Sequence, residues 1–399
     1  MSWNDGRIAI IQEALREHGL DAIVCALPAN VLMLSGYWPV VGTAIAVATS
    51  DGKTSVLAPQ DEVELARRGY AQHVATFHAG SLERISTAAQ AAEQPLAAML
   101  GSLDLLTARI GFESGEWLEP SPYASLHLYC DAIPSVLKRI APRANPTNAD
   151  AMLRELRAVA SPDEINRIRA SCSIAAQAYQ QGAAALRGGA TESQAAAHFR
   201  THLYVTAPPV IDCGRADGFV FCMSGPNAAT AHGAYARSRG RALAPGDLVL
   251  VHCNSYVDGY WTDITRTFCI GSPNPQQHRM YSAIFAARDA ALAMIRPGAR
   301  AADIDRAARD VLSQHGFGDA FKHSTGHGVG FAAIDHNAMP RLHPKSPDVL
   351  REGMVFNVEP GIYLEDQGMR HCEMVAVTHD GCERLTPFQA DIASLSLLG

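Results

Sequence analysis

Two runs of β-favouring residues flank the dipeptide Asp258-Gly259 and predict a β-hairpin over residues 248–268. Asp-Gly accepts positive φ at both central positions of a two-residue turn, so it also predicts the register of the two strands. In that register Asn254 faces Asp263, and His252 lies two residues along the same strand. Because side chains alternate between the faces of a strand, these three share one face. That face is either a solvated polar surface or part of a site.

The first part of the chain alternates between helix-like and strand-like patterns, which predicts an α/β domain over residues 1–148. Helices are expected at 7–18, 61–68 and 82–100, and strands at 21–27, 43–48, 54–58, 108–112 and 132–137. Two prolines and an asparagine between residues 141 and 147 indicate the end of this domain. Its histidines are dispersed, and we find no catalytic constellation in it.

The remaining residues, 149–399, begin with long helices and contain an internal repeat. A helix is expected from Ser161, as N-cap, to residue 186, followed by two glycines and a second helix. Residues 186–190 match residues 295–299, an offset of 109 residues, and a strand-rich segment follows each copy. Two similar halves that place their strands side by side would enclose a central site. Chance similarity between Ala-rich helices is the alternative.

The composition narrows the class of protein. A chain of 399 residues is too long for one ordinary core, so two domains are expected. The net charge is −7 and no basic cluster tracks one face, which argues against a nucleic-acid partner. No apolar run approaches the length of a membrane span, and the N-terminus lacks the pattern of an export signal. The nine cysteines are scattered without a CxxC, which is typical of a protein in the reducing cytoplasm.

Candidate chemistry concentrates in the second half, where twelve of the sixteen histidines lie from His198 onward. Besides the hairpin, four stretches carry polar groups beside glycines or apolar strands. They are 223–233 with His232, 322–336 with His323, His327 and His336, 354–363 with Glu359, and 368–378 with Arg370, Cys372 and Glu373. In the last stretch Arg370 and Cys372 share one strand face, while Glu373 points to the other.

Five of these residues are potential metal ligands on or beside strands of the same half: His252, Asp263, His327, Glu359 and Cys372. A carboxylate such as Glu359 at the end of an apolar strand is costly to bury unless it is paired or binds a metal. Carboxylate with imidazole suits manganese, iron, cobalt or zinc, and thiolate with a second imidazole shifts the preference to zinc or iron. From composition and spacing alone, a metal site and a metal-free polar cluster are equally open.

The same stretches resemble the motifs of the pita-bread metallopeptidases, the superfamily of creatinase, aminopeptidase P, prolidase and methionine aminopeptidase (peptidase family M24). The similar segments are SGPNAATAHG, GYWTDITRTF, STGHGVG, VFNVEPGIY and GMRHCEMVAVT, in the family's order, and DAIVCALPANVLMLSGY in the first domain. The resemblance implies an α/β fold in which a creatinase-type N-terminal domain precedes a pita-bread domain with a pseudo-twofold repeat. It also implies a homodimer.

The resemblance is incomplete at two ligand positions. The family usually holds two metal ions with two aspartates, one histidine and two glutamates, and Asp263, His327 and Glu359 match three of these positions. His252 stands at the first aspartate and Cys372 at the last glutamate. Glu373 could be recruited only through a one-residue bulge. The options are one ion on the three matching residues, a dinuclear zinc site that adds His252 and Cys372, or a creatinase-like site without metal.

The resemblance also implies roles for the other candidate residues. His232 matches a proton-handling histidine, as general acid/base or oxyanion stabiliser, with a structural role as the alternative. His323 and His336 match substrate-contacting positions, or else line the pocket. Arg370 would hold a substrate carboxylate or orient Asp263.

The leading expectation is a cytoplasmic hydrolase of a C–N amide-like bond in a small substrate, similar to an Xaa-Pro dipeptidase or aminopeptidase. Water would be activated by one or two divalent ions of zinc, manganese or iron. The first alternative is a creatinase-like amidohydrolase or amidinohydrolase that works without metal, with Glu359 as general base. The second is a non-catalytic binding protein of the same fold, against which the retained histidines and carboxylates argue.

Overall fold

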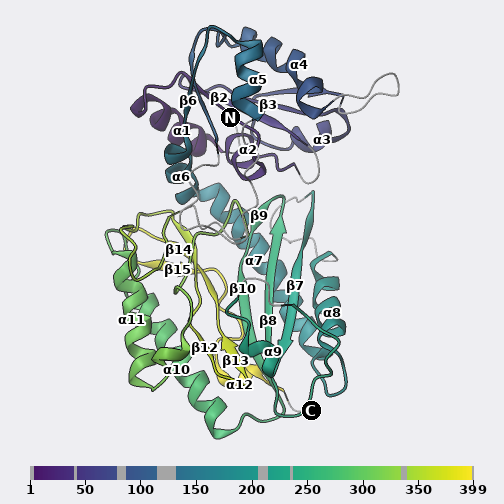
Figure 1. Cartoon of the computed structure of the whole chain (residues 1–399), viewed down its shortest axis with the longest axis vertical. Coiled ribbons are helices and arrows are strands. Elements are labelled where there is room, and N and C mark those ends of the chain that lie inside the picture. Colours follow the sequence, from purple (N-terminus) through teal and green to yellow (C-terminus); the bar gives the residue numbers. More distant parts are fainter. Residues whose placement is uncertain are drawn as a thin grey trace. The chain divides into compact units, whose positions relative to one another are not determined.

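The computed structural model describes residues 4–39, 43–78, 87–114, 132–204, 214–233, 237–333 and 339–397. The chain forms two compact units, Met1–Asp163 and Glu164–Gly399 (Figure 1). Each unit combines helices with β-sheet, as the sequence predicts. No helix among the described residues is long and apolar enough to cross a membrane.

The described part of the first unit is built on a six-stranded sheet in the order β4-β3-β2-β1-β5-β6. The strands are β1 (Ala22–Cys25), β2 (Ile45–Thr49), β3 (Thr54–Pro59), β4 (His73–Phe77), β5 (Arg109–Phe112) and β6 (Asn145–Asn148). The helices are α1 (Asp5–Glu17), α2 (Pro28–Ser35), α3 (Val63–Ala66), α4 (Ala88–Ser102), α5 (Ala132–Ile140) and α6 (Asp150–Ala158), with a 3-10 turn at Gln60–Glu62. Apolar side chains of the sheet pack against α4 and α5 in one core.

Two expectations for this unit differ from the structure. Residues 132–137 lie in helix α5 rather than in a strand, because Ile133, Val136 and Leu137 recur at helical spacing and bury one face of it. The unit ends at Asp163 rather than at residue 148, since the proline-containing segment forms the edge strand β6 and α6 packs on α1 and α2. The sequence pattern also misses helix α2. The first residues of the expected 82–100 helix lie outside the described ranges.

Among the described residues of the second unit, strands form three sheets, in the orders β16-β10-β8-β7 with β9 on β8, β11-β14-β15, and β12-β13. The strands are β7 (Ala216–Ser224), β8 (Leu248–Val257), β9 (Tyr260–Trp261), β10 (Ile264–Ile270), β11 (Val355–Val358), β12 (Gly361–Tyr363), β13 (Gly368–Arg370), β14 (Glu373–Val377), β15 (Cys382–Arg384) and β16 (Ser396–Leu397). The helices are α7 (Pro162–Gly182), α8 (Glu192–Tyr204), α9 (Pro226–Ala229), α10 (Pro275–Ala293), α11 (Ala301–Gln314) and α12 (Ile392–Leu395), with 3-10 turns at Ala183–Ala185 and Gly318–Ala320. Helix α8 lies beside β7, and α10 and α11 pack together on the other side of the strands (Figure 1).

The internal repeat predicted from the sequence is visible in the structure, where equivalent hydrogen bonds occur in both copies. The amide of Gly189 donates to the carbonyl of Leu243 (3.0 Å), and the amide of Gly298 donates to that of Leu350 (2.9 Å). Helices α8 and α11 each begin three residues after these glycines. The two copies therefore share backbone geometry, and the matching sequences are not a chance similarity of Ala-rich helices.

A buried group of charges fixes the start of β14. Glu373 is fully buried and accepts hydrogen bonds from Arg384 (2.6 Å) and Thr386 (2.7 Å). Arg266, also fully buried, and Arg288 lie 3.5 and 3.7 Å from its carboxylate. Although burial alone raises the pKa of a carboxyl group, Arg266 and the neighbouring cations hold the pKa of Glu373 at about 2. Glu373 therefore points to the other face of its strand, as predicted, and no bulge recruits it to the opposite face.

We expect Glu373→Gln to lower the free energy of unfolding by about 3 kcal/mol, because it leaves the buried Arg266 without a carboxylate. Since the folded pKa is depressed, the wild-type contribution is present above about pH 4.3 and lost as the pH falls towards about 2. Urea unfolding across this pH range measures both effects. Glu383→Gln, in an exposed pair with Arg169, is the control and should cost less than about 1 kcal/mol. Equal losses in the two variants would contradict the assignment.

Candidate active site

The predicted hairpin forms in the predicted register. Asp258 and Gly259 have φ values of 49° and 88°, and β8 pairs with β10 so that His252 faces Thr265. Nδ1 of His252 lies 3.7 Å from Oδ1 of Asp263, which confirms that the two side chains share a face. Asp263 is 2% exposed, so this face is not a solvated surface.

Neighbouring strands extend this face on both sides. Phe221 of β7 pairs with His252, and the two rings stack with centroids 6.3 Å apart. On the other side an isolated antiparallel bridge joins Thr265 to Cys372, whose amide donates to the Thr265 carbonyl (3.0 Å). Strands from the two copies of the repeat thus meet at the candidate ligands.

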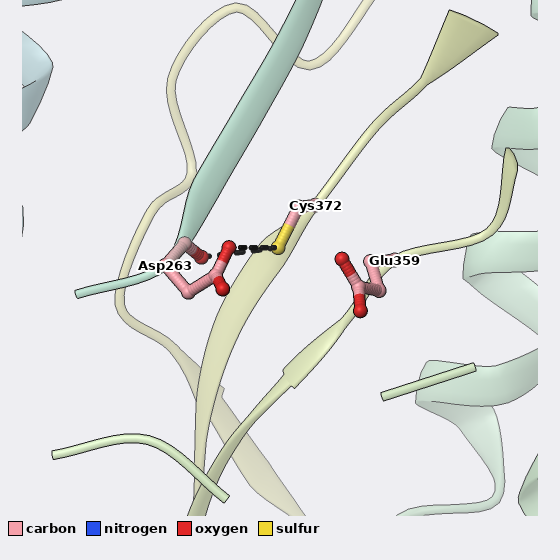
Figure 2. Close-up of side chains that lie close together, drawn as sticks. All are labelled: Asp263, Glu359 and Cys372. Atoms are coloured by element: carbon pink, nitrogen blue, oxygen red, sulfur yellow. Dashed lines mark hydrogen bonds between the residues drawn. The ribbon is translucent and has the colours of Figure 1, made fainter. Parts of the chain in front are cut away.

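Three of the candidate ligands converge from three separate segments. Nε2 of His327 lies 3.6 Å from Oδ2 of Asp263 and 3.7 Å from Oε1 of Glu359. The side chains of Asp263, Glu359 and Cys372 also point towards one another (Figure 2), with donor atoms within 4.8 Å of each other. Two carboxylate oxygens and an imidazole nitrogen at these separations can share one cation.

Strand β11 holds the loop that carries His327. The amide of His327 donates to Oδ1 of Asn357 (2.7 Å), and the amide of Asn357 donates to the His327 carbonyl (3.1 Å). Nδ1 of His327 faces the carbonyl of Gly328 at 3.0 Å, so that nitrogen carries the proton. Nε2 therefore carries a lone pair, which accepts a hydrogen bond from Nδ2 of Asn357 (3.2 Å) in this structure, and a metal ion bound there would displace that neutral amide.

The electrostatics of the group favour a cation. Burial, together with the charge of Asp263, raises the pKa of Glu359 to about 7, although Arg370 and His327 act in the opposite direction. Two buried carboxylates at close range repel each other, so one of them takes up a proton unless a cation lies between them. The donor set of Asp263, His327 and Glu359 thus fits one divalent ion.

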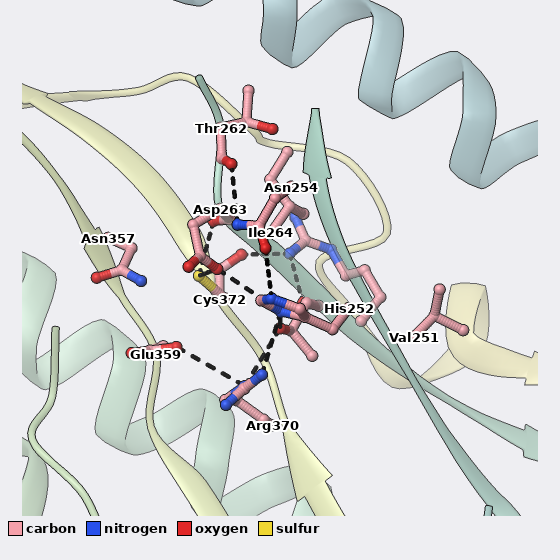
Figure 3. A network of polar contacts seen from close by, with 12 residues as sticks. Val251, His252, Asn254, Thr262, Asp263, Ile264, Asn357, Glu359, Arg370 and Cys372 are labelled. Atoms are coloured by element: carbon pink, nitrogen blue, oxygen red, sulfur yellow. Dashed lines mark hydrogen bonds and ion pairs between the residues drawn. The ribbon is translucent and has the colours of Figure 1, made fainter. Parts of the chain in front are cut away.

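His252 is engaged in a different set of contacts (Figure 3). Its Nε2 lies 2.9 Å from Oδ1 of Asn254, and its Nδ1 lies 3.2 Å from Nη2 of Arg370 and 3.0 Å from Oγ1 of Thr265. Burial lowers the pKa of His252, and Arg370 adds to the effect against the opposing charge of Asp263. Both ring nitrogens therefore have protein partners, and the imidazole is neutral.

Cys372 lies on the same face as Arg370, as predicted, but as a thiol. Its Sγ donates to the backbone carbonyl of Asp263 at 3.0 Å and lies 3.9 Å from Oδ1 of that residue. Burial raises the pKa of the Cys372 thiol far above its usual value, and the two nearby carboxylates add to this. In this structure the contact between the thiol and the Asp263 carbonyl is therefore a hydrogen bond.

His232 and His323 are brought together by Tyr363, which the sequence analysis did not single out. Nε2 of His323 lies 2.9 Å from the Tyr363 hydroxyl, and the ring of His232 packs edge-on against Tyr363 at 5.4 Å. Burial lowers the pKa of His323 to about 3, lowers that of His232 and raises that of Tyr363 to about 12. Arg370 lowers the pKa of Tyr363 and Glu359 raises it, so this group lies within electrostatic range of Glu359. His336 lies outside the described residues.

Comparisons with known proteins agree over both units. Residues 166–379 match the metallopeptidase family M24, and residues 7–159 match the creatinase/prolidase N-terminal domain. The chain is 27% identical over 390 residues to the Xaa-Pro dipeptidase of Pyrococcus horikoshii, across 97% of this chain and 98% of the relative. It is 32% identical over 246 residues to the Xaa-Pro dipeptidase of Pyrococcus furiosus, across 61% and 67%. The crystal structure of the prolidase from Pyrococcus horikoshii superposes with a TM-score of 0.74 at 26% identity, covering 97% of this chain and 99% of that one.

Gly326 is expected to be essential for placing His327. A Cβ at this position would overlap the backbone oxygen of Asn357, so Gly326→Ala should lower the free energy of unfolding by more than about 2 kcal/mol. Gly188→Ala is the matched control, because a Cβ there meets nothing within 4 Å, and it should change stability by less than about 1 kcal/mol. Thermal unfolding of both variants tests the difference, and similar midpoints would show that the loop can move away from β11.

Proposed function

The chain belongs to the metallopeptidase family M24, and from this we propose that it hydrolyses the C–N bond of a small amide substrate such as an Xaa-Pro dipeptide. The family and the creatinase/prolidase N-terminal domain confirm the resemblance read from the sequence motifs. Relatives named Xaa-Pro dipeptidase and prolidase, which align over nearly the whole chain, support this substrate class. The observation that supports the proposal most is the buried group of Asp263, His327 and Glu359, whose donor atoms face one position.

A divalent ion of zinc, manganese or iron on these three residues would lower the pKa of the attacking water and polarise the scissile carbonyl. Asp263 and Glu359 each offer one oxygen, and His327 offers Nε2 because its Nδ1 donates to Gly328. The second oxygen of Glu359 lies 3.7 Å from Nε of Arg370, which holds the carboxylate in place. The ligands are therefore oriented before substrate arrives, which reduces the cost of reorganisation during the reaction.

We assign the proton transfers to the histidines around Tyr363. His323, with a pKa lowered by burial to about 3, stays neutral, and its contact with the Tyr363 hydroxyl orients that side chain. The ring of His232 packs edge-on against that of Tyr363, and we assign His232 the proton delivered to the leaving amine, or the stabilisation of the oxyanion. Substrate contact by His336, substrate-carboxylate binding by Arg370, the homodimer and the cytoplasmic location stay predictions.

A creatinase-like hydrolysis without metal is the second candidate. One observation favours it: the pKa of Glu359, raised to about 7 by burial, suits a general base at neutral pH. In this reading Arg370 stabilises the ionised Glu359, which then takes a proton from water and becomes a carboxylic acid while the water oxygen attacks the carbon of the scissile bond. The candidate predicts activity that chelators leave unchanged.

The substrate class is tested with a series of dipeptides. We expect Xaa-Pro dipeptides to be hydrolysed with a kcat/KM at least about tenfold higher than matched Xaa-Ala dipeptides, because a proline-shaped pocket gains binding energy from the ring. Creatine and small non-peptide amides serve as the comparison set. Preferential turnover of that set would favour the creatinase-like candidate, and no turnover of any compound would favour a non-catalytic protein of this fold.

The dependence on metal is tested at Asp263. We expect Asp263→Asn to lower kcat/KM at least about 100-fold and to abolish metal retention, because it removes one of three ligands. Asp289→Asn is the control, since this exposed carboxylate on α10 pairs with Arg288, outside the site. Elemental analysis and chelator titration of the wild type complete the test. Activity that persists fully in chelator would refute the metal-dependent reaction.

A further inference from the structure

In each of the two buried carboxylates of the site, Asp263 and Glu359, the two oxygens face different groups. Asp263 turns Oδ2 towards Nε2 of His327 (3.6 Å) and Oδ1 towards Nδ1 of His252 (3.7 Å). Glu359 turns Oε1 towards His327 (3.7 Å) and Oε2 towards Nε of Arg370 (3.7 Å). The carboxylates therefore border two positions. His327 faces one of them. The guanidinium of Arg370 and the imidazole of His252 face the other (Figure 3).

On the side of Arg370 and His252, the nitrogen atoms that could bind a metal ion already make hydrogen bonds within the protein. Nη2 of Arg370 lies 3.2 Å from Nδ1 of His252, and Nε2 of that ring lies 2.9 Å from Oδ1 of Asn254. A guanidinium has donors and no acceptor, so the lone pair of Nδ1 must accept in this contact. A metal ion on Nδ1 would have to displace this charged guanidinium, whereas an ion on Nε2 of His327 would displace the neutral amide of Asn357, which lies 3.2 Å away. His252 therefore serves Arg370 as an acceptor.

Arg370 is held in place from several directions. Its Nε lies 3.2 Å from Oγ1 of Thr265 as well as 3.7 Å from Glu359, and its side chain is 12% exposed. Cys372, the other unusual residue on this side, directs its thiol to the carbonyl of Asp263 at 3.0 Å. Arginine keeps its charge in such surroundings, so this side carries a fixed positive charge. A divalent ion placed there would meet like-charge repulsion at close range.

We propose that the guanidinium of Arg370, held by His252 and Thr265, takes the place of a second metal ion, so that the site binds a single divalent ion on Asp263, His327 and Glu359. The inference rests on the proposed metal-dependent hydrolase. It adds that the charge on one side of the carboxylates is supplied by the chain itself. Chelators remove the ion and leave that charge in place.

The number of ions bound to the full-length protein tests this proposal. Metal-depleted wild type is titrated with Mn²⁺, and binding is followed by calorimetry and by the electron paramagnetic resonance of the bound ion. We expect about one equivalent per chain and the six-line spectrum of isolated Mn²⁺. Two equivalents with an exchange-coupled spectrum would overturn the inference and leave the metallohydrolase standing. No binding at all would overturn both.

Variants assign the effect to Arg370. The triple variant Arg370→Met, His252→Asp, Cys372→Glu removes the guanidinium and restores carboxylates on that side, so we expect the count to rise from about one to about two equivalents. Arg384→Met, which removes a guanidinium beside Glu373 and outside the site, is the control and should still bind about one.

The single variant Arg370→Met distinguishes the effect of losing the guanidinium charge from an effect on folding. Circular dichroism verifies that each variant is folded before its ions are counted. We expect this single variant to retain about one ion, with the position beside it open to solvent. A folded triple variant that still binds only one ion would show that Arg370 does not set the number, and would overturn the assignment.

Discussion

The charge of two buried carboxylates governs the arrangement of the second unit. Asp263 and Glu359 are 2% and 7% exposed and come from different copies of the repeat. A buried carboxylate without a partner costs several kcal/mol, so the fold has to bring positive or hydrogen-bonding groups to both. The loop held on β11 supplies His327, and strand β13 supplies Arg370. The hairpin, the loop and β13 are thus joined by one electrostatic requirement.

The repeat shows how similar backbones give two unlike sides. His252 and Glu359 are each the fifth residue counted from the start of β8 and β11, and Asp263 and Arg370 each follow eleven residues later. In the first copy the imidazole precedes the carboxylate, at 3.7 Å from it. In the second copy the carboxylate precedes the guanidinium, also at 3.7 Å. The order of acid and base is reversed between the copies, so His252 of the first copy and Arg370 of the second lie on the same side of the two carboxylates, 3.2 Å apart.

Local signals in the sequence predicted much of this arrangement. Asp258-Gly259 alone determines the register that aligns His252 with Asp263, because a two-residue turn leaves no freedom of pairing. The strand expected at 132–137 is a helix, since a short apolar run carries both periods and its packing against α4 decides between them.

What the sequence could not show is which groups meet across long distances along the chain. The partner of His252 lies 118 residues away, so its role as an acceptor for Arg370 depends on the tertiary fold. The division of the chain after Asp163 also depends on packing, because α6 has to find α1 before it belongs to the first unit. Tyr363, by contrast, follows Glu359 by four residues in the VFNVEPGIY segment, and its position there could have drawn attention to it.

The two unusual residues are best understood together through their charge. The resemblance of the sequence motifs implies carboxylates at the positions of His252 and Cys372. Burial lowers the pKa of the His252 imidazole and raises that of the Cys372 thiol, so neither side chain carries a negative charge in this structure. Two carboxylates at these positions would balance the charge of one further divalent ion in a buried site, which the imidazole and the thiol do not. With one neutral residue and one carboxylate at these positions, the charges of the ligands would match neither one divalent ion nor two. With two neutral residues they match one ion.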